Sequence, residues 1–260
     1  MTSRSNSQAS AATQTRALRQ IVLHVCMVGT VAMVACNKSS DKPNAAESTA
    51  AVAAPVTANQ SVRAADTIPT GTDAQADSLL VDVQSIDKTI VVDMRYRNAS
   101  NFTGAPLPGY QGNHAFMRRE AALALAQVQA SLKPQGLGLK IWDAYRPVRA
   151  TLEMVAWTVR VHRENLVRDG YIADKSKHNL GVAIDLTLIN RANGRELDMG
   201  TPHDEFSTNA HTANATGAVA ANRAILVNAM AAQKFANYDQ EWWHFSFDVP
   251  NPLRFDMIVR

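Results

Sequence analysis

Two segments about sixty residues apart carry side chains that could bind a metal ion and use it for catalysis. His178 and Asp185 lie in the first segment, and His244 lies in the second. Two imidazole nitrogens and one carboxylate oxygen form the ligand set of a catalytic zinc site, whose fourth position stays open for water. Glu241 lies three residues before His244 and is the candidate general base. The pattern therefore predicts one Zn²⁺ per chain and hydrolytic chemistry.

Each segment alone also fits a less specific interpretation, because a histidine near an aspartate is most often a surface residue or a hydrogen-bonded core residue. The two segments together favour the metal site. The chain has only seven histidines, and two of them lie in strand-like segments beside carboxylates. Such clustering is typical of a metal or catalytic centre.

The first segment has the alternation of a β-strand with one face in a core. Large aliphatic residues alternate with small or polar ones over 182–188, which places Asp185 on the face away from the core. Gly181 precedes this strand and permits a turn that returns His178 to the same cavity. The small side chain of Ala183 leaves room there for an ion.

The second segment, 243–247, alternates aromatic residues with His244 and Ser246 and is also expected to be a strand. In a straight strand, an offset of three residues would place Glu241 and His244 on opposite faces. We therefore expect the chain to bend near Glu241, so that its carboxylate turns toward the metal.

The order and spacing of these residues resemble the signature of the VanX-like D-Ala-D-Ala dipeptidases, Ser-x-His-x-x-Gly-x-Ala-x-Asp followed by Glu-x-x-His. The resemblance covers roughly residues 78–260. It extends to other segments in the family's order, namely 93–96, 101–104, 139–147 and 199–201. It implies a zinc peptidase that hydrolyses D-alanyl-D-alanine to two D-alanines.

By position, the resemblance also implies roles for individual side chains. The zinc ligands are His178, Asp185 and His244, the base is Glu241, Arg146 stabilises the transition state, Tyr96 and Asp204 hold the substrate ammonium, and Ser176 lies near the substrate carboxylate. From local sequence alone, an ordinary surface arginine, a core aromatic and a turn carboxylate would fit equally well at Arg146, Tyr96 and Asp204.

The sequence departs from the family pattern at two places beside these residues. His203 precedes Asp204 where relatives often have an aromatic residue, and residues 206–216 lack the family's histidine-containing pattern. We therefore expect the rim of the pocket to differ from that of relatives.

The proposed binding residues explain why a dipeptide would be preferred. A dipeptide carries an ammonium and a carboxylate, and burying either without a partner costs on the order of several kcal/mol. Asp204 and Tyr96 would pair with the ammonium, and Ser176 with backbone N–H groups would bind the carboxylate. Longer peptides lack the free amine and would leave Asp204 unpaired.

Two alternatives remain open. Related zinc peptidases share the signature, so the chain could be a D,D-carboxypeptidase or endopeptidase that acts on wall peptides. It could also be a wall-binding lipoprotein without catalysis, although binding alone would not require Glu241 and Arg146.

The N-terminus predicts export. An apolar run over 21–35 follows three arginines and ends just before Cys36, which is the pattern of a lipoprotein signal peptide at 1–35 with lipidation at Cys36. The run is shorter than the about 20 residues of a membrane span. An uncleaved N-terminal anchor and cleavage without lipidation are the competing interpretations.

Residues 36–77 are rich in Ala, Ser, Thr and Pro and are predicted to form a flexible tether. The chain is thus expected to be a membrane-anchored periplasmic lipoprotein of a bacterial cell envelope. An exported enzyme cannot readily reach a cytoplasmic dipeptide pool, which favours a role in peptidoglycan turnover over glycopeptide resistance. The net charge of +3 is small, and no basic run with interleaved aromatics points to nucleic acid. No obligate protein partner is evident.

Residues 78–260 are long enough for one core and predict a single α+β domain with a mainly antiparallel sheet and helices packed on one side. Hydrophobic spacing predicts that Leu152, Val155 and Val159 face inward. The expected strands are 81–83, 90–96, 137–142, 182–188 and 243–247, and the expected helices are 117–132, 147–161 and 219–235.

Overall fold

The computed structural model describes residues 68–260. The predicted signal peptide, the lipidation of Cys36 and the tether up to residue 67 lie outside the described residues. The first helix, α1 (Asp73–Leu79), spans the predicted domain boundary at residue 78. In the part of the chain described here, no helix has the length and apolar composition needed to cross a membrane.

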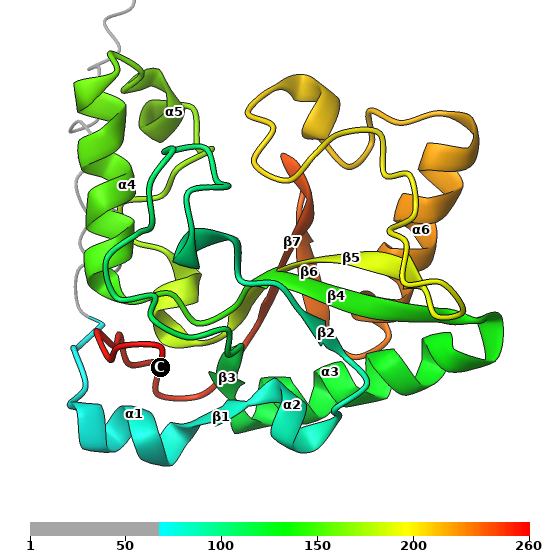
Figure 1. Cartoon of the computed structure of the whole chain (residues 1–260), viewed down its shortest axis with the longest axis horizontal. Coiled ribbons are helices and arrows are strands. Elements are labelled where there is room, and N and C mark those ends of the chain that lie inside the picture. Colours follow the sequence, from blue (N-terminus) through cyan, green and yellow to red (C-terminus); the bar gives the residue numbers. More distant parts are fainter. Residues whose placement is uncertain (1–67) are drawn as a thin grey trace, which may run out of the picture. The chain divides into compact units, whose positions relative to one another are not determined.

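A five-stranded sheet organises the described residues (Figure 1). Its strand order is β2-β4-β5-β7-β6, in which β2 pairs with β4 in parallel and the other neighbours are antiparallel. The α+β class and the mainly antiparallel sheet are therefore confirmed. The strands are β2 (Val91–Val92), β4 (Leu137–Asp143), β5 (Ala183–Asn190), β6 (Phe235–Tyr238) and β7 (Glu241–Phe247).

Helices α3 (Arg119–Leu132) and α6 (Gly217–Ala231) form one layer against this sheet, where they contact each other and neighbouring strands. The buried side chains of β5 that alternate with Asp185 belong to the same hydrophobic core as the buried residues of these helices. Helices α4 (Val148–Arg160) and α5 (Asn165–Arg168) contact each other, and Figure 1 shows them on the opposite side of β7 from α6.

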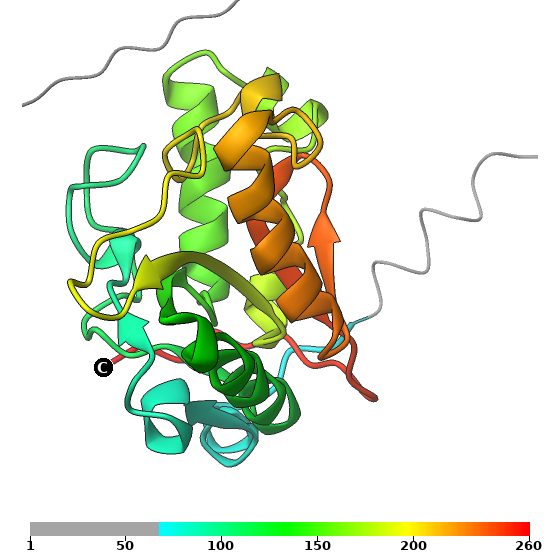
Figure 2. The same ribbon diagram turned by 90° about the vertical axis from the view of Figure 1, so that its right-hand side faces the viewer.

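Smaller elements complete the described residues, and Figure 2 shows the cyan helices α1 and α2 at the base of the fold below α3, which α2 contacts. A two-stranded sheet pairs β1 with β3 in antiparallel orientation. The elements are β1 (Leu80–Asp82), α2 (Val83–Ile86), β3 (Phe116–Arg118) and the 3-10 helices η2 (Arg95–Arg97), η3 (Lys133–Gln135), η4 (Lys177–Leu180) and η5 (Thr208–Ala210).

Several predicted elements differ in extent. The predicted strand 90–96 is strand only over Val91–Val92, because the chain enters η2 soon afterwards. Met117 lies in β3 rather than in the helix that follows. The helix predicted over 219–235 ends at Ala231, and Lys234 with φ 67° precedes the short strand β6, which the sequence pattern did not reveal.

The orientation predicted for the helix at 147–161 was wrong for Leu152 and Val159, whereas Val155 packs against the core as predicted. Leu152 and Val159 are 59% and 55% exposed, whereas Ala150, Thr151, Met154 and Thr158 form the buried face of α4. Two residues of the buried face make polar contacts with the site. Thr151 accepts a hydrogen bond from Asn179, and the Met154 sulfur accepts one from Arg146.

Candidate active site

Three side chains bring one ligand atom each to a common point, as the sequence predicted. His178 Nε2 lies 3.4 Å from Asp185 Oδ1 and 3.2 Å from His244 Nδ1, and the last two atoms are 2.9 Å apart. Tetrahedral Zn²⁺ with bonds of about 2.0–2.2 Å has ligand atoms about 3.3–3.6 Å apart. The spacing of the three atoms therefore fits one metal ion with little movement.

Strand pairing and a tight turn produce this convergence. Asp185 on β5 lies directly opposite His244 on β7 in the antiparallel register. His178 lies in η4, and Gly181 ends that helix in the left-handed conformation with φ 67° while its N–H donates to the carbonyl of His178. Because only glycine adopts this conformation without strain, the turn predicted at Gly181 has a direct backbone cause.

The tautomer of His178 is fixed by its surroundings. Its Nδ1 lies 2.6 Å from the carbonyl oxygen of Ala144, and a carbonyl can only accept, so Nδ1 carries the proton. Nε2 is then the bare nitrogen that faces the other two ligand atoms. A backbone carbonyl commonly orients a metal-binding histidine in this way.

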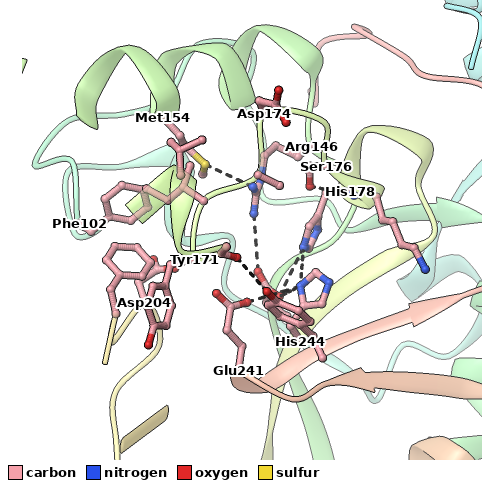
Figure 3. A pocket seen from close by; sticks show the side chains of 18 of the residues that line it. Phe102, Arg146, Met154, Tyr171, Asp174, Ser176, His178, Asp204, Glu241 and His244 are labelled. Atoms are coloured by element: carbon pink, nitrogen blue, oxygen red, sulfur yellow. Dashed lines mark hydrogen bonds and ion pairs between the residues drawn. The ribbon is translucent and has the colours of Figure 1, made fainter. Parts of the chain in front are cut away.

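Glu241 points toward the metal ligands, as the expected bend requires. Its Oε2 lies 3.9 Å from His244 Nδ1, and Figure 3 shows both side chains facing His178. The cause is an irregularity in the pairing of β6 with β7. Asn237 pairs with Phe245, but the next residue, Tyr238, pairs with Glu241, so that three residues of β7 between these two pairs have no partner on β6. The Asn237 amide nitrogen donates to the carbonyls of Glu241 and His244 and so closes the looped segment.

We expect Asn237→Ala to lower kcat about tenfold, because the segment between Glu241 and His244 loses both of its side-chain donors. The half-buried carbonyls lose partners, so the free energy of unfolding should also fall by about 1–3 kcal/mol. Steady-state kinetics and urea unfolding measure the two effects. Asn193→Ala, in an exposed turn, is the matched control, and an unchanged kcat in Asn237→Ala would show that the irregularity does not position the base.

Arg146 also lines this cavity, and its side chain is held there by an ion pair with Asp143 that was not predicted from the sequence. Its guanidinium donates from Nε to Asp143 Oδ2 at 2.8 Å, and one terminal nitrogen lies 3.7 Å from Asp185 Oδ2. Asp143 is fully buried, accepts a hydrogen bond from Tyr110 at 2.5 Å, and lies 3.3 Å from Nδ1 of His178. It therefore orients Arg146 and lies beside a metal ligand, and its place in the motif 139–147 was the only sequence signal for it.

The residues predicted to bind substrate line the same cavity, which has a volume of about 360 Å³. The Tyr96 hydroxyl donates to Asp204 at 2.9 Å, and both lie at the cavity wall with Arg146 and Glu241. Ser176 also lines it, and its Oγ accepts the N–H of His178 at 3.2 Å. Because that oxygen accepts from the backbone, its O–H stays available as a donor to a ligand.

Burial and charge set the ionisation of the acidic residues. Burial raises the pKa of Asp185, but contacts with its three histidine neighbours outweigh burial and hold this pKa well below its ordinary range. Burial raises the pKa of Glu241 well above its ordinary value, with further increases from Asp185 and Asp204. A bound cation would lower the pKa of Glu241 again, into the range useful for a general base.

The fold and these groups together are those of a metal-dependent hydrolase, since a ligand triangle, a carboxylate base and a fixed arginine share one cavity. A family model described as D-ala-D-ala dipeptidase (Peptidase_M15) matches residues 76–253. The chain belongs to this family of metallopeptidases, which confirms the resemblance noted in the sequence.

Individual relatives in sequence are also named D-alanyl-D-alanine dipeptidases. The D-alanyl-D-alanine dipeptidase of Enterococcus faecalis is 35% identical over 176 residues, which is 62% of this chain and 87% of the relative. That of Escherichia coli is 34% identical over 182 residues, which is 69% of this chain and 89% of the relative. Among solved structures, the vancomycin resistance D,D-dipeptidase VanXYg is similar at 17% identity and a TM-score of 0.33, covering 65% of this chain and 66% of that one.

Proposed function

We propose that this chain is a zinc-dependent dipeptidase that hydrolyses D-alanyl-D-alanine to two D-alanines. The observation that carries this proposal is the triangle of His178, Asp185 and His244 ligand atoms with Glu241 beside it in one cavity. Two nitrogens and one oxygen with an open fourth position are a typical ligand set of catalytic zinc. The family match and the names of the relatives support the choice of substrate.

Zn²⁺ bound by these ligands would lower the pKa of a coordinated water and polarise the scissile carbonyl. Glu241 would take the proton from the attacking water and later deliver it to the leaving amine. Arg146 would stabilise the charge that develops on the carbonyl oxygen, because its guanidinium lines the cavity and Asp143 fixes its direction. Burial lowers the pKa of Arg146, but Asp143 and other neighbouring groups outweigh burial and raise this pKa well above its usual range, so the guanidinium stays charged.

Asp204 and Tyr96 would bind the substrate ammonium, and Ser176 would donate to the substrate carboxylate. Burial raises the pKa of Tyr96 well above its ordinary value, so the phenol stays neutral and donates to Asp204. These groups lie around the ligand triangle in one cavity, so a dipeptide bound between them would place its peptide bond beside the metal site.

A panel of D,D-, L,D- and L,L-dipeptides tests the proposal. We expect D-alanine release from D-alanyl-D-alanine and a loss of at least about 10²-fold when a chelator removes the metal, because water activation is lost. Added Zn²⁺ should restore the activity. Release that persists at full rate in metal-free protein, or a lack of release by zinc-loaded protein, would contradict the proposal.

Two further substrates distinguish the dipeptidase from a carboxypeptidase or endopeptidase. N-acetyl-D-alanyl-D-alanine and a wall pentapeptide both lack the free amine that Asp204 would bind. We expect kcat/KM for both to be lower by at least about 10²-fold, because the largely buried Asp204 would lack the ammonium that pairs with its charge. Equal hydrolysis of the pentapeptide would instead support the carboxypeptidase.

We also propose that the mature protein is a lipoprotein of the cell envelope and acts in peptidoglycan turnover. The apolar run at 21–35 before Cys36 and the polar composition of 37–77 support this proposal. Incorporation of a labelled fatty acid into the wild type but not into Cys36→Ser tests the lipidation. A mature wild-type protein that remains in the cytoplasm would contradict the localisation and the role.

A further inference from the structure

His203 lies between a metal ligand and the carboxylate proposed to bind the substrate ammonium. Its Nε2 is 3.4 Å from Asp185 Oδ2, and its Nδ1 is 3.4 Å from Asp204 Oδ2. The side chain is only 5% exposed. One imidazole thus contacts two carboxylates that would perform different tasks.

Aromatic side chains hold the His203 ring in this orientation. Trp142 stacks on it with ring centroids 4.9 Å apart and an interplanar angle of 30°, and Trp243 meets it edge-on at 5.4 Å and 82°. The ring therefore has little freedom to turn either nitrogen away from its carboxylate.

His203 does not line the cavity that contains the metal ligands. It lines a second cavity of about 340 Å³ together with Trp142 and Thr187, and Asp204 borders both cavities. A dipeptide held in the first cavity would not touch the imidazole. Any effect of His203 on the reaction would therefore pass through Asp185 or Asp204.

The two oxygens of Asp185 face different groups. Oδ1 belongs to the metal-ligand triangle, whereas Oδ2 faces the His203 imidazole and the Arg146 guanidinium. Partners on the outer oxygen fix the direction in which a carboxylate presents its inner oxygen to a metal.

Asp204 needs donors for a different reason. Its backbone adopts a positive φ of 62°, which is uncommon for a residue other than glycine, and its side chain is largely buried. A buried carboxylate must be hydrogen-bonded to remain charged, and Tyr96 supplies one donor. His203 is the second polar neighbour of this carboxylate.

We propose that His203 is a positioning residue that fixes Asp185 as a metal ligand and Asp204 as the acceptor of the substrate ammonium. Only the role at Asp204 rests on the proposed function. The role at Asp185 concerns metal binding and can be tested without a substrate.

His203→Phe tests the proposal, because phenylalanine keeps the aromatic packing and removes both polar contacts. We expect KM for D-alanyl-D-alanine to rise about tenfold and zinc to be lost about tenfold faster to a competing chelator. The kcat of the zinc-saturated variant should change by no more than about threefold, since His203 does not touch substrate. His114→Phe removes another histidine–carboxylate contact, remote from the site, and is the matched control.

Two amide variants separate the contacts. The asparagine amide nitrogen lies near the position of imidazole Nδ1, and the glutamine amide nitrogen near that of Nε2. We therefore expect His203→Asn to restore KM to near the wild-type value and His203→Gln to restore the slow zinc loss of the wild type. Thermal unfolding checks that each variant folds.

The outcomes are distinguishable. If His203→Phe leaves both KM and zinc retention within about twofold of the wild type, the positioning role is wrong. If the wild type hydrolyses no D,D-dipeptide, the proposed function fails. In that case, slower zinc loss from the wild type than from His203→Phe would still support the role of His203 at Asp185.

Discussion

Glu241→Gln is expected to lower kcat for D-alanyl-D-alanine by about 10³-fold while zinc content stays unchanged. Glutamine has nearly the same shape but cannot accept the proton of the attacking water, and general-base catalysis contributes about 10²–10⁴-fold. Zinc should remain, because the Glu241 carboxylate lies outside the triangle of ligand atoms. Single-turnover kinetics and elemental analysis on the same preparation measure both quantities.

The same variant distinguishes catalysis from simple binding. Should the wild type bind wall fragments without hydrolysing any of them, and should Glu241→Gln bind equally well, the chain would be a wall-binding protein. A kcat of Glu241→Gln within about tenfold of the wild type would show that another group accepts the proton.

Arg146→Lys is expected to lower kcat by about 10²–10³-fold with a smaller change in KM. Charge develops on the carbonyl oxygen only in the transition state, so loss of a fixed donor affects kcat most. Lysine keeps the charge but lacks the planar fork, which here donates to Asp143 from Nε and reaches toward Asp185 with a terminal nitrogen.

Lysine is the informative replacement because Asp143 is fully buried. An alanine at position 146 would leave that carboxylate without its cation and could lower the free energy of unfolding by about 3–5 kcal/mol. Arg149→Lys, which affects an exposed ion pair with Asp256, is the matched control. If KM rose by about 10²–10³-fold while kcat stayed unchanged, Arg146 would act in substrate binding instead.

The metal ligands and Glu241 could be predicted from the sequence because they belong to short motifs with a backbone consequence, whereas the roles of Arg146, Tyr96, Ser176 and Asp204 followed only from the family resemblance. The alternation in 182–188 placed Asp185 on the open face, and the offset of three residues required a bend near Glu241. The structure confirms both features and brings His178, Tyr96, Ser176 and Asp204 to the same cavity.

Asp143 and His203 each have a partner that is distant along the chain, and those contacts could not be assigned from the sequence. Asp143 accepts a hydrogen bond from Tyr110, 33 residues away, and His203 contacts Asp185 across 18 residues. No local pattern records such pairs. His203 was visible only as a departure from the family's aromatic residue.

Helix orientation and short strands were also beyond the sequence pattern. Leu152 and Val159 have the spacing of a buried stripe, yet both are exposed, and α4 buries instead a neighbouring face on which Thr151 and Met154 accept hydrogen bonds. Strand β6 has only four residues and one buried side chain, Phe235, so it leaves no alternation to detect.

The zinc content of the purified protein after dialysis tests the central claim most directly, because every proposed role depends on one cation held by His178, Asp185 and His244. We expect one zinc ion per wild-type chain, as implied by the single triangle of ligand atoms in the described residues. The double variant His178→Ala/His244→Ala should retain almost none. Equal zinc in the wild type and this variant, or none in a wild type prepared with excess zinc, would contradict the account.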